Sequence, residues 1–504
     1  MAATLLARPA AAQDRGRPVA GAEPAVEICR DSPPDIRIGM AIPWRLRGGF
    51  DFRRPRLPAK RLLAGAPVEP APPVQTAPKR FFTAAGEVAL LEVGPWAFNR
   101  YVTKEDFAYI SFDTIKTNFK NGFDYDSDTF TINQSAHPYH GSLFFTAARS
   151  NGYGYWESGA FTLVGSLLWE CCMENTQPSV NDVVNTTLGG MTRGEISHRV
   201  ATMIRDNSAS GSGRLWRELG AAVFDPVGAF TRLLYGDATR EFANPDDRFP
   251  SRFTLAGDIG YRNVDGTAHP NQWILSFSGF YGDPFAGEIQ HPFDSFWVGI
   301  DLNQPGGALV SRIEERGVLK GWELTDSSDA VRHIVGLSQE YEYFNNESQV
   351  FGAQIFGAGI LSRYQLGPRL QAMTDVGLIV LPLAGIQTTD FADPKSGRTY
   401  DYASGAGFRA AARLFREGRE IVGVGYGFAW AHTVNGSSNN STLQYYRGSL
   451  RLPLKGPVGV GAGYSWYSRK TTYSGFFEGR QTQSEWRVFV DLAFSQRWGQ
   501  APSR

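Results

Sequence analysis

The residue types that could do acid–base chemistry gather between positions 137 and 182. His137 opens the run His-Pro-Tyr-His-Gly, and Glu174 and Asp182 follow within the next 45 residues. An imidazole oriented by a carboxylate is a common general base. We therefore predict His137 as a base held by Glu174 or Asp182, with Arg149 binding a phosphate or carboxylate of the substrate.

The same region also has a simpler interpretation as a buried polar network. Glu170 and Glu174 lie one turn apart in a stretch that is otherwise apolar, and such carboxylates are costly to bury unless they are paired. This interpretation requires charge pairs and closed packing, whereas an enzyme requires a cleft beside His137. The residues expected to bind ligand or to form the network are Arg149, Asn151, Glu170, Ser179, Asn181 and Glu195.

No metal site or cofactor is predicted. His137 and His140 are three residues apart, but the spacing does not locate an acidic third ligand. Asp124, Asp126 and Asp128 alternate as in a calcium loop, yet the required glycine and bidentate glutamate are missing, so a turn is favoured. The three cysteines of the chain, Cys29, Cys171 and Cys172, are too few for a disulfide framework or a four-cysteine zinc site.

The elements that would position these residues differ between the two halves of the chain. From residue 250 onward, apolar residues alternate with small or polar ones, as in the run Val422 to Trp430. Such alternation is typical of membrane strands that have one face toward lipid and one toward a lumen. We predict an antiparallel transmembrane β-barrel of about 12 strands over 250–504. Its candidate strands are 253–262, 271–281, 295–302, 307–315, 318–325, 332–344, 350–365, 369–384, 400–415, 419–432, 442–454, 457–469 and 484–496.

The residues before the barrel divide into two segments. Residues 1–80 contain 13 of the 29 prolines and begin with a stretch that resembles the end of a secretory signal, so we expect a signal remnant and a disordered Pro/Arg-rich linker. Residues 81–249 have helical spacing and contain the polar residues described above. We expect this mostly helical segment to pack in or under the barrel, where small lumen-facing residues leave room.

Composition limits the partners of the chain. Lysine and arginine total 50, as do aspartate and glutamate, so a net charge of zero gives no field that would attract nucleic acid. The mean hydropathy of −0.27 argues against a bundle of membrane-spanning helices. The expected partners are outer-membrane lipid and a small envelope molecule or lipid. A water-soluble β-sandwich also alternates and remains an alternative.

A long sequence motif is similar to that of a known protein family. It reads His-Pro-x-x-Gly, Ala-Arg-Ser-Asn-Gly, Trp-Glu-x-x-x-Glu, Ser-x-Asn-Asp and Gly-Gly-x-x-x-Gly-Glu, within about 110–240. Over this stretch the chain resembles an uncharacterised bacterial envelope family, domain of unknown function 3943. The resemblance implies an envelope location and no established activity. The residues that it marks are His137, Gly141, Arg149, Asn151, Gly152, Trp169, Glu170, Glu174, Ser179, Asn181, Asp182, Gly189, Gly190, Gly194 and Glu195.

Three functions are compatible with the sequence. The first is an outer-membrane β-barrel with a structural role, or one that binds or passes an envelope molecule. The second is a membrane-embedded hydrolase or transferase that acts on lipid or lipopolysaccharide through a His/carboxylate/Arg site. The third is a periplasmic binding module on a barrel anchor. Whether the chain is an enzyme, and its oligomeric state, are not decided by its sequence.

Overall fold

The computed structural model describes residues 78–245, 247–286, 289–306, 308–324, 330–388, 397–474 and 478–497. The expected signal remnant and linker therefore lie outside the described residues, except for 78–80. Residues 74–504 form one compact unit. Its first part is helical, with the elements α1 (Phe81–Phe98), η2 (Asn99–Thr103), η3 (Asp106–Ala108), α2 (Phe112–Asn121), η4 (Ile132–Ala136), α3 (His137–Ser150), α4 (Tyr155–Leu168), η5 (Trp169–Met173), α5 (Val180–Val184), η6 (Asn185–Gly189), α6 (Gly190–Ile204), α7 (Gly211–Phe224) and α8 (Pro226–Leu234).

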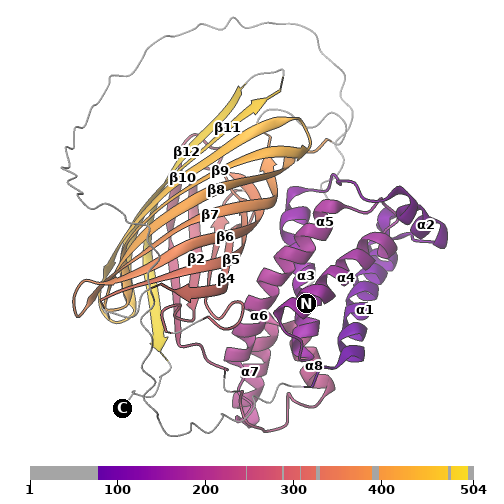
Figure 1. The fold of residues 1–504 in the computed structure, drawn as a ribbon, viewed down its shortest axis with the longest axis horizontal. Helices are drawn as coiled ribbons and strands as arrows, with labels where there is room; N and C mark the ends of the chain where they lie inside the picture. Colours follow the sequence, from indigo (N-terminus) through magenta and orange to yellow (C-terminus); the bar gives the residue numbers. More distant parts are fainter. Residues whose placement is uncertain are drawn as a thin grey trace, which may run out of the picture. The chain divides into compact units, whose positions relative to one another are not determined.

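The second part is a closed antiparallel barrel (Figure 1). Each strand pairs with its neighbours in the sequence, and β1 pairs with β12 to close the sheet. This confirms the predicted barrel. Its strands are β1 (Arg252–Val264), β2 (Asn271–Tyr281), β3 (Phe296–Gln304), β4 (Val310–Glu323), β5 (Val331–Asn345), β6 (Val350–Gln365), β7 (Leu370–Gln387), β8 (Tyr400–Arg416), β9 (Arg419–Asn435), β10 (Asn439–Pro453), β11 (Val458–Tyr473) and β12 (Glu478–Arg497).

Thirteen candidate segments become twelve strands because 307–315 and 318–325 belong to one element, β4. The pairing of β4 with β5 shifts in register between Val318 and Lys320. An extra residue of this kind interrupts the alternation without ending the strand. The break in the sequence pattern was therefore a bulge and not a turn.

The two faces of the sheet separate apolar from charged side chains. Ile259, Leu378 and Val488 point outward and are more than half exposed. Their neighbours along the strands point into the lumen, where Asp258 pairs with Arg451. Because successive residues of a strand face opposite sides, the outer wall is apolar and the inner wall is charged.

The two ends of the barrel differ in their connections. β8 and β9 are joined by the two-residue turn Glu417–Gly418, in which both residues have positive φ, as such tight hairpins require. We call the end that carries this connection the turn end. The opposite end carries the connection 388–399 between β7 and β8, and we call it the loop end; the connection 282–295 between β2 and β3 lies at the turn end.

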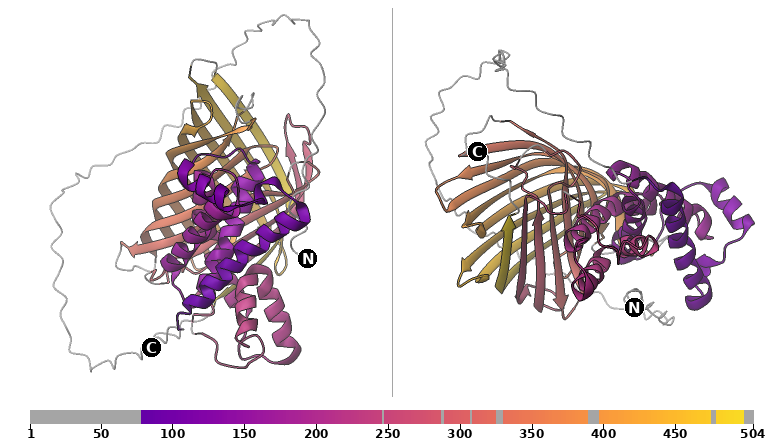
Figure 2. Two further views of the ribbon diagram at one scale, coloured as in Figure 1. Left: turned by 90° about the vertical axis from the view of Figure 1, so that its right-hand side faces the viewer. Right: turned by 90° about the horizontal axis from the view of Figure 1, so that it is seen from below.

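The helices pack against the outside of the barrel. Inside the lumen, Glu314 bonds to Arg447, Arg316 to Asp375, and Glu340 to Arg409. The residues that alternate with them, Glu315, Gln339 and Tyr341, therefore face outward. The helical residues bond to these outward side chains: Arg193 to Glu315, Tyr155 to Gln339, and Tyr341 to the carbonyl oxygen of Gln134. Figures 1 and 2 show the helices beside the barrel wall.

The presence of N-terminal helices is confirmed, but the expectation that they pack in or under the barrel is corrected. At Gly427, a lumen-facing residue of β9, a barrel side chain fills the space instead, since a Cβ there would meet the ring of Tyr445. Within the described residues, no helix combines the length and hydropathy needed to cross a membrane.

Candidate functional site

The structure brings three of the predicted site residues together. His137 Nε2 lies 3.3 Å from Asp182 Oδ1. Ligand atoms of His137, Glu170 and Asp182 all lie within 4.8 Å of one another. Glu170 and Asp182 are almost fully buried, and the His137 side chain is 12% exposed. We call this group the His137 cluster.

Three chain segments supply the cluster. His137 begins α3, Glu170 lies in η5, and Asp182 lies in the first turn of α5. The loop before α5 is fixed to η5 because the backbone N–H of Ser179 donates to Glu170 Oε2, at 2.8 Å. Ser179 therefore acts through its backbone.

Two glycines allow the close helix contact on which the cluster depends. A Cβ at Gly190 would lie 2.5 Å from the carbonyl carbon of Gly141, and a Cβ at Gly141 would overlap the carbonyl oxygen of Thr186. The start of α3 can therefore touch η6 and the start of α6. This contact brings Thr186 Oγ1 to 3.2 Å from His137 Nδ1.

Acidic and amide groups surround the cluster; the prediction included Asn181 but missed Asp126 and Asn133. Asn181 Nδ2 donates to both Asp182 and Asp126. Asn133 Nδ2 donates to Asp126 Oδ1 at 2.8 Å and to the hydroxyl of Tyr400 at 2.7 Å. The signal in the sequence was the run of alternating aspartates, which we had interpreted only as a turn.

The loop that carries Asp126 also carries a perturbed carboxyl group. Burial, followed by the charge of Asp126, raises the pKa of Asp128 to about 6. Tyr400 of β8 donates to the carbonyl oxygen of Asp128 at 2.7 Å. This loop therefore brings crowded acidic groups against the barrel wall.

Glu174 is near the cluster but does not orient His137. Its two carboxylate oxygens accept from Trp169 Nε1, at 2.6 Å, and from Thr176 Oγ1, at 3.0 Å. Of the two predicted partners of His137, the structure therefore pairs it with Asp182. Glu174 is the C-cap residue of η5.

Arg149, Asn151 and Glu195 belong to separate networks. Arg149 donates to both oxygens of Glu195, at 2.7 and 3.1 Å, and Arg199 donates to the same carboxylate. Asn151 donates to Glu87. Twelve residues of helix, about 18 Å, separate Arg149 from His137 along α3. Arg149 is thus engaged within the protein and does not face the His137 cluster.

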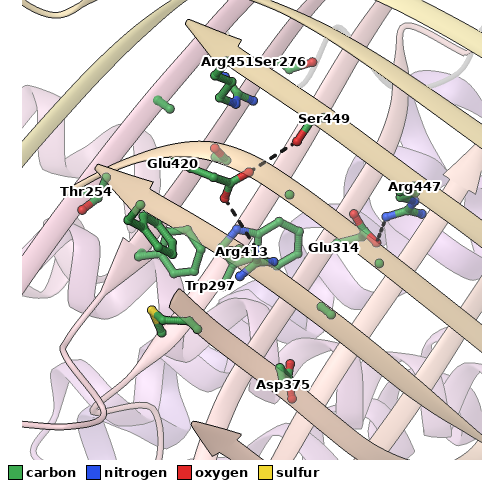
Figure 3. Close-up of a pocket in the computed structure, with 18 of the residues that line it drawn as sticks. Thr254, Ser276, Trp297, Glu314, Asp375, Arg413, Glu420, Arg447, Ser449 and Arg451 are labelled. Atoms are coloured by element: carbon green, nitrogen blue, oxygen red, sulfur yellow. Dashed lines mark hydrogen bonds and ion pairs between the residues drawn. The ribbon is translucent and has the colours of Figure 1, made fainter. Parts of the chain in front are cut away.

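The large cavity lies elsewhere, in the barrel lumen (Figure 3). Its volume is about 410 Å³, and its lining residues all come from the barrel and its connections. It extends toward the turn end, since Arg252, Gly418 and Arg419 are among the lining residues. No residue of the His137 cluster lines it.

Several charge pairs line the cavity. Arg451 holds Asp258 through two hydrogen bonds, and Arg447 donates to Glu314 at 2.7 Å. Arg413 is less tightly held, because its nearest carboxylate, Glu420, is 3.6 Å away and its side chain is 34% exposed. Its guanidinium lies over the ring of Phe280, 5.4 Å from the centroid.

Side chains fill the lumen at the loop end. Phe344, Phe351 and Ile386 belong to a packed apolar cluster whose members are all less than 10% exposed. On β1 and β12, at the same end of the barrel, Arg262 is fully buried against Glu485. The lumen therefore consists of a cavity toward the turn end and a packed plug toward the loop end.

The comparisons agree with the resemblance noted in the sequence. Residues 122–227 match the family model described as domain of unknown function (DUF3943). The family resemblance is confirmed over this segment, which contains the whole His137 cluster. None of the curated proteins searched matches the chain.

Two solved porins and a further outer-membrane protein are similar to part of the chain. A NanC porin is 10% identical, with a TM-score of 0.24, and the match covers 47% of this chain and 98% of the porin. A KdgM porin in complex with disordered oligogalacturonate is 12% identical, with a TM-score of 0.21, over 47% and 99%. OmpT of Vibrio cholerae is 7% identical, with a TM-score of 0.23, over 48% and 98%.

Proposed function

We propose that this chain is an outer-membrane protein whose barrel binds a small anionic envelope molecule in its lumen, and whose helices lie beside the barrel in the same bilayer. The apolar outer wall of the barrel supports the membrane location. A wall of this kind, closed and free of sheet edges, suits a hydrocarbon environment.

Like the barrel strands, helices α1 and α4 have apolar residues on the exposed face and polar residues on the buried face. On α1 the charged residues Glu87 and Glu92 are buried, whereas Leu90 is 60% exposed. On α4, Ser158, Thr162 and Ser166 are buried, while the exposed residues include Leu163, Val164 and Leu168. A water-facing helix has the opposite arrangement, with polar residues outside. This arrangement favours contact with lipid over a periplasmic binding module.

Spin labels at exposed helix positions test this membrane contact. Leu90→Cys and Val164→Cys, labelled in a background without the native cysteines, should be accessible to oxygen and protected from a water-soluble nickel chelate. Asn121→Cys on α2, a helix with exposed lysines, is the matched control and should be accessible to nickel. Nickel accessibility at Leu90 and Val164 equal to that at Asn121 would show that the helices lie in water.

The cavity suits a ligand that combines an anionic group with an apolar or ring face. The observation that carries this proposal is Arg413, a half-buried guanidinium beside an aromatic pair in a cavity of small-molecule size. Phe280 and Trp297 form that pair, with centroids 6.3 Å apart. A carboxylate or phosphate can bond to a guanidinium while a ring lies on the aromatic surface.

The plug at the loop end favours binding over open passage. Calorimetry of the detergent-purified chain with glucuronate and with glucose tests the charge requirement. We expect heat of binding for glucuronate only, and a loss of at least tenfold in affinity in Arg413→Gln. Arg369→Gln is the matched control, because Arg369 is exposed and paired with Glu417 away from the cavity lining. Equal binding of both sugars, or equal affinity in Arg413→Gln, would contradict the proposal.

The enzyme alternative rests on the contact between His137 and Asp182. It assigns His137, Asp182 and Glu174 to catalysis, but Arg149 is held by Glu195 and the cavity described lies in the barrel. Comparing envelope lipid composition in cells with His137→Ala and with wild-type protein separates the two functions. A lipid change at normal protein level favours the enzyme, whereas loss of the folded protein favours a structural role.

A further inference from the structure

The side chains of the His137 cluster are of the types that bind metal ions. One imidazole nitrogen and carboxylate oxygens from two other segments converge within 4.8 Å. Imidazole and carboxylate together suit divalent transition-metal ions. The three donors come from η5 and from the starts of α3 and α5, so one bound ion would join three separate segments.

The imidazole is oriented as a ligand would be. His137 Nδ1 lies 3.2 Å from Thr186 Oγ1, and Nε2 points at Asp182. When Nδ1–H donates to the hydroxyl of Thr186, the lone pair of Nε2 faces the carboxylates. A hydrogen bond from the second nitrogen to a neighbouring oxygen is the usual support of a metal-bound histidine.

The carboxylates of the cluster have no lysine or arginine ion-pair partner among the described residues, although Arg398 donates to the backbone carbonyl oxygen of Asp126. Asp126 lies within hydrogen-bond reach of Asp182, so two carboxylates meet there. Between described residues, no ion pair joins a lysine or arginine to the carboxylates of Asp126, Glu170 or Asp182, and His137 pairs with the carboxylate of Asp182. Two buried carboxylates in contact require a proton or a cation between them.

An unbonded oxygen provides a second, independent observation. Asn133 is fully buried, and its Oδ1 has no hydrogen-bond partner in the described part of the chain. The same amide donates from Nδ2 to Asp126 Oδ1, so the Asn133 side chain lies next to the acidic group. A buried acceptor without a donor is costly, and a metal ion would satisfy it.

We propose that His137, Glu170 and Asp182 bind one divalent transition-metal ion, such as Zn²⁺. The ion would fix α3, η5 and α5 to one another, and Asp126 and Asn133 offer further oxygen ligands. This site is independent of ligand binding in the lumen, because no residue of the cluster lines the cavity.

Metal content of the full chain tests the proposal. Detergent-purified protein is treated with a chelator, equilibrated with Zn²⁺, freed of unbound ion and analysed by mass spectrometry. We expect one zinc per chain in the wild type and less than one tenth of that in His137→Gln and Asp182→Asn. The matched control is His198→Gln, since His198 is a partly buried histidine of α6, 3.6 Å from Asp225, and this variant should keep one zinc.

X-ray absorption at the zinc edge gives a second readout that needs no variant. We expect one imidazole and only oxygen as the remaining ligands. Sulfur ligands would assign the ion to Cys171 or Cys172 and overturn the proposal. So would a wild-type protein that retains no zinc, or a folded His137→Gln protein, judged by heat-modifiable electrophoretic migration, that retains one.

Discussion

Arg193 of α6 and Glu315 of β4 form an ion pair, with Nε 3.2 Å from Oε1, between the helices and the barrel wall. Both side chains are largely buried, at 13% and 6% exposed. The guanidinium of Arg193 also lies over the ring of Tyr341, 5.1 Å from its centroid. One charged contact thus joins two parts of the chain that are more than 100 residues apart.

Arg193→Ala should destabilise the packing of helices on the barrel. The substitution leaves the Glu315 carboxylate buried without a partner, a change that typically costs about 3–5 kcal/mol. Denaturant unfolding in detergent, followed by helical circular dichroism, measures the loss. The double variant Arg193→Ala/Glu315→Gln removes the unpaired charge and should recover most of the stability. An equal loss in both variants would show that the pair does not stabilise the packing.

Gly141→Ala should weaken the contact between α3 and η6. Its Cβ would overlap the carbonyl oxygen of Thr186, which is backbone and cannot rotate away. We expect a destabilisation of about 1–3 kcal/mol, measured by thermal unfolding in detergent. Gly86→Ala on α1 is the control, since no atom lies within 4 Å of its Cβ, and it should be neutral or stabilising. Equal stability of the two variants would contradict the predicted clash.

Removing the plug should open the barrel. In the wild type, we expect low conductance in planar bilayers, because Phe344 and Phe351 help to fill the lumen at the loop end. The double variant Phe344→Ala/Phe351→Ala should show larger and more frequent current steps. Phe408→Ala removes a ring that is 41% exposed on the outer wall and serves as the control. A wild-type conductance as large as that of the double variant would rule out a closed plug.

Charge on the helix face that we propose to contact lipid should impair membrane assembly. An arginine at the centre of a membrane helix costs about 2.5–3.5 kcal/mol, so Leu90→Arg and Val164→Arg should each lower the yield of membrane-assembled protein. Asn121→Arg on α2 should leave that yield unchanged. Fractionation and heat-modifiable migration provide the measurement. Normal assembly of both arginine variants would place α1 and α4 outside the bilayer.

The barrel could be predicted because alternation directly encodes a sheet with two unlike faces. In β9 the apolar Val424 and Trp430 alternate with glycine and alanine, and the structure places them outward. The bulge in β4 could not be distinguished from a turn, because both interrupt the alternation.

The position of the helices outside the barrel was harder to predict from the sequence, although the residue pattern of β5 indicated it. Its outward residues Gln339, Tyr341 and Tyr343 are polar or hydroxyl-bearing, which a strand facing only lipid would avoid. Tyr341 and Tyr343 contact Phe130 and its neighbours in a shared core. Polar residues on both faces of β5 thus indicated that its outer face packs against protein and not only against lipid.

The candidate site was predicted only in part. His137, Glu170 and Asp182 were named and do converge. Arg149 and Glu195 were grouped with them because sequence proximity was taken for spatial proximity. A straight helix separates residues that lie three turns apart. Asp126 and Asn133 were missed because their loop reaches the cluster only through tertiary packing.

The outward polar side chains of β4, β5, β6 and β8 restrict how this architecture can be divided or inherited. Glu315, Gln339 and Gln354 are covered only while the helices remain in place. A shortened gene that encodes the barrel alone would present these groups to acyl chains, with no donor or acceptor to replace those lost. The two halves are therefore expected to be gained, lost and exchanged together, as a single evolutionary unit.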